Sequence, residues 1–166
     1  MRLDRLLAER KKDHFYIMHL SYDGEDKEPL WNYAKENNVI GLDYPSEVND
    51  DWNHVSESVK ERVPRIWVKQ FEMFCNQMRE GDIVIILEGW HSILGIAEVE
   101  DRKYRYEQGL SENGVFFDHI RRVKWIKKHD YGKHPKLPRP VRGFRNTLYR
   151  VERNTGRWSI LSNTDV

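Results

Sequence analysis

The sequence of 166 residues predicts one α+β domain, built on a small curved mixed β-sheet or a small β-barrel with flanking helices. Short stretches with strand character recur along the chain, and a few stretches with helical spacing of apolar residues separate them. The clearest of these elements are a β-hairpin over 81–100 and a helix that begins near Pro64. The sequence contains no internal repeat.

The hairpin has the sequence GDIVIILEGWHSILGIAEVE. Residues 83–87 are rich in β-branched side chains and predict a buried strand, residues 88–92 supply a turn, and residues 93–99 form the return strand. Gly95 interrupts this second strand, which indicates a bulge or the close approach of another backbone or a ligand. Trp90 is a large aromatic in a turn, where its burial is not guaranteed.

The elements before the hairpin follow from apolar spacing and from helix and strand breakers. We expect a short N-terminal helix, a strand over 14–20, a helix over 28–37 that stops at Asn37–Asn38, a strand over 39–44, and a helix over 55–63. Proline suits the start of a helix, so Pro64 opens the next one. Its apolar stripe predicts core packing and contains Ile66, Trp67, Phe71, Phe74, Cys75 and Met78.

After the hairpin the chain becomes more polar. Residues 101–114 read as a polar segment, 115–127 as a strand or a bent pair of strands, and 128–140 as a basic loop with three prolines. Residues 141–151 predict a last strand or a turn leading into one, 153–156 a turn, and Trp158, Ile160 and Leu161 pack back onto the core.

Charge is distributed unevenly along the chain. Residues 119–157 hold 13 Lys/Arg and 2 Asp/Glu, whereas residues 1–118 hold 15 Lys/Arg and 24 Asp/Glu. The basic segment 119–157 beside the acidic residues 1–118 indicates a face that binds a polyanion. Alternatively, the two parts could pair with each other across the fold.

The sequence contains no P-loop, no GxGxxG fingerprint, no HExxH and no GxSxG elbow. The single cysteine, Cys75, excludes a disulfide framework within the chain and any multi-cysteine zinc site, and the histidines are scattered. We therefore expect a binding module with no cofactor and no metal rather than an enzyme. No apolar run is long enough for a membrane span and the N-terminus lacks a signal-peptide core, so we expect a cytoplasmic location without membrane contact.

Aromatic residues on loops and a basic segment remain as candidate functional features. Aromatic rings stack on bases, and Lys and Arg bind phosphates, so together they favour nucleic acid over a generic small molecule. The basic segment from Arg121 to Arg157 is expected to clamp a nucleic-acid backbone. Its candidate contacts are Arg121, Arg122, Lys124, Lys127, Lys128, Lys133, Lys136, Arg139, Arg142 and Arg145.

The order of elements resembles the PUA-like superfamily, and in particular its EVE and YTH branches. The residues that carry this resemblance are Gly81–Val84, Gly95–Val99 (GIAEV), the segment His119–Ile126 and the strand Asn38–Tyr44. Those branches read nucleic acids, and the YTH branch holds a methylated adenine in an aromatic cage. A narrower resemblance is to the DNA-reading N-terminal domains of archaeal McrB-like restriction proteins, in which a separate GTPase domain follows.

This resemblance implies a base pocket in the present chain. Ile40 and Gly41 stand where the YTH branch has a tryptophan, so that cage cannot be transferred directly. The walls would instead have to come from Tyr44, Trp90, Tyr104 or Tyr106, with Trp31 as a further candidate, and Asp43 could hydrogen-bond to a base edge.

The leading hypothesis is a DNA-binding module that recognises a modified base, methylated in the first instance, by flipping it into an aromatic pocket. Such a module would target a modification-dependent restriction system. RNA binding by the same type of domain is the alternative. Two other classes stay open: a small-molecule or enzymatic domain of the related ASCH type, with Asp43, Lys103 and Glu98 as its candidates, and a protein-interaction domain whose basic segment meets an acidic partner.

Overall fold

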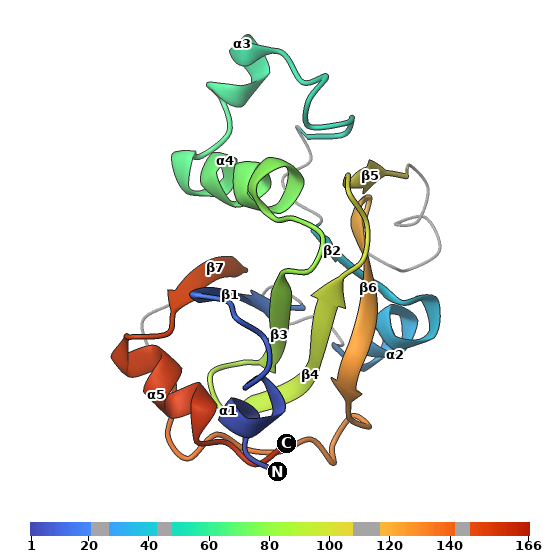
Figure 1. Ribbon diagram of the computed structural model, residues 1–166. Coiled ribbons are helices and arrows are strands. Elements are labelled where there is room, and N and C mark those ends of the chain that lie inside the picture. The colour runs from blue at the N-terminus through green and yellow to red at the C-terminus, as the bar shows by residue number, and fades with distance from the viewer. Residues whose placement is uncertain (21–26, 43–47, 108–116, 142–146) are drawn as a thin grey trace.

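The computed structural model describes residues 1–20, 27–42, 48–107, 117–141 and 147–166 (Figure 1). Its strands are β1 (His14–His19), β2 (Val39–Leu42), β3 (Ile83–Glu88), β4 (Ser92–Val99), β5 (Arg105–Tyr106), β6 (His119–Lys128) and β7 (Leu148–Glu152). Its helices are α1 (Leu3–Leu6), α2 (Lys27–Asn37), α3 (Glu57–Lys60), α4 (Arg65–Glu72) and α5 (Gly156–Ser162), with a π-helical turn η1 (Met73–Gln77) directly after α4.

The strands form one mixed sheet in the order β2-β6-β4-β3-β1-β7, and β5 pairs with β6 outside this order. The sheet curls strongly into a half-barrel with flanking helices, which confirms the predicted α+β class and the curved mixed sheet (Figure 1). The predicted hairpin is β3 with β4, and β6 extends it as an antiparallel neighbour of β4.

β1 and β3 form a parallel pair on one side of the sheet. β1 lies beside β3 with Tyr16 opposite Val84, and β7 lies antiparallel on the other side of β1 with Val151 opposite Phe15. The sequence predicts these strands separately, but it carries no local signal for this pairing, because the partners of β1 lie far along the chain.

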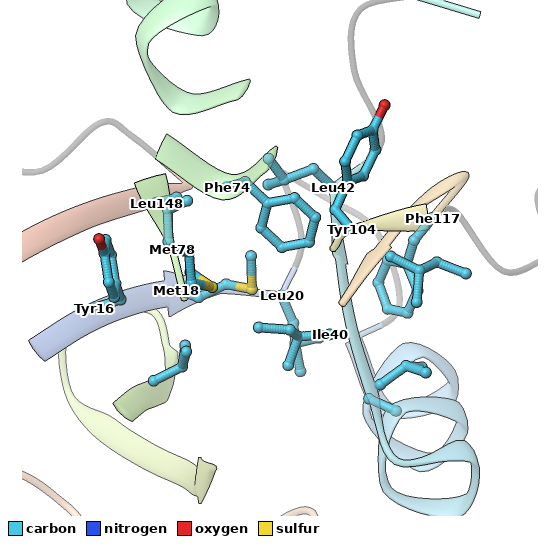
Figure 2. Close-up of a cluster of buried hydrophobic side chains, with 14 of the residues drawn as sticks. Tyr16, Met18, Leu20, Ile40, Leu42, Phe74, Met78, Tyr104, Phe117 and Leu148 are labelled. Atoms are coloured by element: carbon cyan, nitrogen blue, oxygen red, sulfur yellow. The ribbon is translucent and has the colours of Figure 1, made fainter. Parts of the chain in front are cut away.

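Two hydrophobic cores cover the two faces of the sheet. In the first core, α2, α4 and η1 pack against side chains of the sheet such as Met18 and Ile86. In the second core, α1 and α5 pack against Ile17 and Ile85, the residues that precede these two in β1 and β3. Adjacent residues in a strand point to opposite faces, so a fully buried strand can supply both cores. In Figure 2, Phe74 and Met78 lie close to Met18 and Leu20 in the first core.

The helices begin and end where the sequence places their signals, within a few residues. α2 ends before Asn38, which has a positive φ of 54° as expected for a helix stop, and Pro64 precedes the first residue of α4. Cys75 is buried in η1, and its burial raises the pKa of the thiol. The C-terminal segment, predicted only to pack on the core, forms α5 with Thr155 as its N-cap.

Gly95 confirms the predicted close approach. A Cβ atom at this position would lie 2.6 Å from Cη2 of Trp31 and 3.1 Å from the carbonyl oxygen of Lys127. The strand register also shifts on both sides of Gly95. In the pairing of β4 with β3 the shift lies between Ile86 and Leu87 of β3, and in the pairing of β4 with β6 it lies between Ile96 and Ala97 of β4. The neighbour that needs the space is therefore the side chain of Trp31 together with the β6 backbone.

Candidate nucleic-acid interface

The candidate interface begins with cations on β6 and on the loop that follows it. Seven of the ten predicted backbone contacts have exposed side chains: Arg122, Lys124, Lys127, Lys128, Lys133, Lys136 and Arg139. Within the part of the chain that the structure describes, none of these seven forms an ion pair. The acidic body of the protein therefore does not neutralise them by direct contact. Arg142 and Arg145 lie outside the described residues.

The strand pattern of β6 places the first of these cations on its outer face. Arg122 and Lys124 are exposed, whereas the residues that alternate with them, Arg121 and Val123, are buried. Successive side chains of a strand point to opposite faces, so the two cations project together.

The loop after β6 is held along the end of the hairpin by backbone hydrogen bonds. The amide of His129 donates to the carbonyl of Leu94 at 3.0 Å, and the amide of Ile93 donates to the carbonyl of Pro135 at 3.0 Å. The amide of Val141 then donates to the carbonyl of Trp90 at 3.0 Å. The basic loop thus runs from β6 to the hairpin turn. We call residues 122–139, which are β6 from Arg122 onward together with most of this loop, the basic strip.

A side-chain cluster, for which the sequence carries no local signal, also anchors the basic strip. The hydroxyl of Tyr131 donates to Oε1 of Glu88 at 2.5 Å, and Nε2 of His134 lies 2.5 Å from Oε2 of the same carboxylate. The amide of Gly132 donates to Nδ1 of His134 at 3.1 Å, so the protonated nitrogen that faces Glu88 is Nε2. Glu88 ends β3, so these contacts fasten the loop to the sheet.

The pKa of Glu88 reflects this cluster. Partial burial by itself would raise the pKa of the carboxyl group, but the hydrogen bonds from Tyr131 and His134 outweigh this effect and lower the pKa below its ordinary value. The carboxylate form is therefore the one that holds the loop.

Arg121 is not a backbone contact, and this part of the predicted interface is wrong. Its side chain has 0% exposure, and its Nε donates to Oδ1 of Asp101 at 2.7 Å. Its Nη1 donates to the carbonyls of Phe74 and Met78 at 2.8 Å each. The guanidinium is thus bound inside the protein, and its burial keeps it away from a phosphate at the surface.

Arg153 shows the same behaviour in the C-terminal part of the basic segment. Its guanidinium donates to the carbonyls of Arg10 and Lys12 at 2.7 and 2.5 Å, and it lies over the rings of Phe15 and Trp158. This arginine ties the N-terminal segment to β7 and α5, and it takes no part in the interface.

The predicted base-pocket aromatics do not come together. Trp31 has 0% exposure, and its Nε1 donates to the carbonyl of His129 at 2.8 Å while its ring meets Trp125 edge-on. Trp31 therefore belongs to the core. Asp43 and Tyr44 lie outside the described residues.

Tyr104 and Tyr106 lie at the other end of the sheet from Trp90. Tyr106 pairs with His119 at the start of β6, whereas Gly95 of the hairpin pairs with Lys128 at its end. At roughly 3.3 Å per residue, these ends of β6 are about 30 Å apart. One pocket cannot contain Trp90 and both tyrosines, so the predicted pocket is wrong in this respect.

Both tyrosine hydroxyls are engaged within the protein. The Tyr104 hydroxyl points away from the apolar cluster in Figure 2, and it accepts the amide of Trp52 and donates to Oδ1 of Asp51 at 2.8 Å. The Tyr106 hydroxyl donates to the carbonyl of Asn49 at 2.6 Å. These contacts hold the segment around Trp52 against β5, so both tyrosines have structural roles.

Trp90 is the predicted pocket residue that fits a binding surface. Its side chain is 40% exposed, and its backbone carbonyl accepts the amide of Val141, two residues after Arg139. An exposed indole therefore lies at the end of the basic strip, where a base could stack beside phosphate contacts.

The structure thus defines an α+β protein with a curled half-barrel sheet and a basic strip along β6 and the loop that follows it. The chain belongs to the family described as "Domain of unknown function (DUF8426)", whose model matches residues 18–152. Neither a curated protein nor a solved structure gives a match. No helix in the described ranges is long and apolar enough to cross a membrane.

Proposed function

We propose that this chain is a nucleic-acid-binding module that holds the phosphate backbone with the basic strip. The observation that carries the proposal is the set of seven exposed cations over 122–139, which form no ion pair with other described residues. Lysine and arginine side chains fixed on a rigid surface bind phosphates and release counterions, which gives affinity that falls steeply with salt.

DNA is the proposed partner ahead of RNA, and a modified base is the proposed target. Both steps rest on the resemblance to the EVE and YTH branches of the PUA-like superfamily, and the curled mixed sheet is compatible with that fold. Of the predicted pocket aromatics in the described ranges, only Trp90 is exposed enough to stack on a base. A role as the targeting domain of a restriction system belongs to the same proposal.

The proposal predicts how charge removal acts on binding. The variant K124Q/K127Q/K128Q removes three cations from β6, and the control R62Q/R65Q/K69Q removes three exposed cations from α4 and the segment before it. Fluorescence anisotropy would measure the affinity of both variants for a duplex DNA over a range of salt concentrations. The first variant should lower affinity and reduce the slope of log affinity against log salt by about 0.9 for each lost contact.

Two outcomes would overturn the proposal. One is the absence of binding to duplex DNA, single-stranded DNA and RNA by the unmodified protein at low salt. The other is an equal loss of affinity in both triple variants, because the basic strip would then have no special role. Parallel titrations with methylated duplex, unmodified duplex and an RNA hairpin decide between DNA and RNA and test the preference for a modified base.

A further inference from the structure

A cleft of about 410 Å³ lies along β7, between α5 and the end of the basic loop. β7 is the last strand of the sheet in the described ranges, and α5 packs beside it (Figure 1). Three arginines from three different segments line the cleft, namely Arg139, Arg150 and Arg157. The fold therefore gathers cations that are separated along the chain.

The charge of this cleft is positive. Glu152 is the acidic residue in its lining, and Oε1 of Glu152 lies 2.7 Å from Nε of Arg150. This pair is half-exposed, so it is weak and can open toward a ligand. A guanidinium offers donors in a fixed fork that matches two oxygens of a phosphate, which makes an arginine-lined cleft suited to a phosphoryl group.

The cleft also has an apolar wall. Ile160 is half-buried and is the apolar side chain of this lining that a ligand can reach, whereas Val141 and Val151 are buried in the core. A site for inorganic phosphate needs no such wall, whereas the flat face of a base or a sugar does. The volume falls within the 300–1,000 Å³ that is typical of sites for small organic ligands.

We propose that this cleft binds one nucleotide unit, with the phosphate on the three arginines and the base against Ile160. The inference rests on the proposed nucleic-acid function and gives it a second contact site beyond the basic strip. Arg139 and the link from Val141 to Trp90 place the cleft next to the end of that strip. A strand held by the strip could therefore deliver a single nucleotide to the cleft.

Calorimetry with deoxyadenosine 5′-monophosphate, deoxyadenosine and inorganic phosphate tests this proposal on the full chain. The nucleotide should bind at least about tenfold more tightly than either part alone. The variant R139Q/R157Q should weaken nucleotide binding at least about tenfold, and the control R62Q/R65Q, with the same loss of charge on exposed residues, should leave it unchanged. A milder variant, I160A, should weaken the nucleotide but not inorganic phosphate.

The proposal is overturned if the nucleotide does not bind, if R139Q/R157Q binds it as tightly as the unmodified protein, or if an acidic hexapeptide binds equally well. Amide shift changes in NMR spectra that avoid Val151 and Ile160 would also overturn it. Duplex binding that still depends on Lys124, Lys127 and Lys128 in such a case would leave the proposed function standing, so the two failures are distinguishable.

Discussion

Arg121 and Asp101 form an ion pair inside the protein, with Nε of the arginine 2.7 Å from Oδ1 of the aspartate. The other carboxylate oxygen of Asp101 accepts the amide of Arg122 at 2.7 Å. The same arginine donates to the carbonyls of Phe74 and Met78 at the end of the π-helical turn. One guanidinium thus joins β6, the segment after β4 and the end of the α4–η1 helix.

Replacement of Arg121 should destabilise the protein strongly. R121Q leaves Asp101 and two carbonyls without their buried donor, and loss of one partner of a buried pair costs about 3–5 kcal/mol. Urea denaturation followed by tryptophan fluorescence measures this change in the free energy of unfolding. R122Q is the matched control, because its side chain is exposed, and it should change stability by less than about 0.5 kcal/mol. Similar losses in both variants would contradict the structural role of Arg121.

A methyl group at Gly95 should be poorly tolerated. G95A places a Cβ 2.6 Å from the Trp31 ring and 3.1 Å from a β6 carbonyl, and a ring packed in the core has little room to move. Overpacking of this kind costs about 1–3 kcal/mol, which thermal or urea unfolding would detect. G156A is the control, since no atom lies within 4 Å of a Cβ at that position. Unchanged stability of G95A would mean that Trp31 can move aside.

Removal of the Trp90 ring should lower the affinity for DNA and leave the stability of the fold nearly unchanged. W90A should weaken binding to single-stranded DNA by about 1–3 kcal/mol through lost stacking, because the side chain is 40% exposed at the end of the basic strip. Its free energy of unfolding should change little. W31A should instead lose about 3–5 kcal/mol of stability, since that ring is fully buried. Anisotropy titrations and urea unfolding of both variants give the comparison, and unchanged DNA affinity of W90A would remove Trp90 from the interface.

Glu88 should make the attachment of the basic loop depend on pH. Because the pKa of Glu88 is lowered in the folded protein, its contribution to stability is complete above the ordinary value of 4.5 and is lost as the pH falls through the lower folded value. The stability difference between the unmodified protein and E88Q should therefore be largest near pH 7 and shrink below pH 4.5. Urea unfolding at several values between about pH 3.5 and about pH 7, which spans this titration, measures the difference.

Hydrogen exchange of the loop amides gives an independent check on the same cluster. E88Q should speed exchange at Leu137 and Val141, whose amides donate to the hairpin turn, and it should leave amides in the centre of β3 unchanged. Equal protection in both proteins would show that the backbone hydrogen bonds alone hold the loop.

The sequence predicts the local elements of this fold well because their signals are local. The β-branched run of β3, the stripe of α4 and the stop at Asn38 depend on neighbours within a few residues. The parallel pairing of β1 with β3 is a contact between distant segments, and no periodicity specifies it.

In the candidate site, too, the sequence predicts local features but not contacts between distant segments. The charge asymmetry predicts the basic strip, but whether a given cation faces water depends on the fold, as the contrast between Arg121 and its neighbour Arg122 shows. The distance between Trp90 and Tyr106 depends on which ends of β6 their strands meet. Tyr131 and His134 both bind the carboxylate of Glu88, and the sequence does not predict this shared contact because the three residues meet only in the folded chain.

The position of β1 has a consequence for the order in which the chain can fold. Its two neighbours in the sheet, β3 and β7, are both made much later during synthesis, and β7 ends at Glu152. Until then the apolar strand FYIM has an open edge, which is the kind of surface that chaperones and other nascent chains bind. Non-local pairing of this type slows folding, so this edge stays exposed for longer than the local hairpin of β3 and β4.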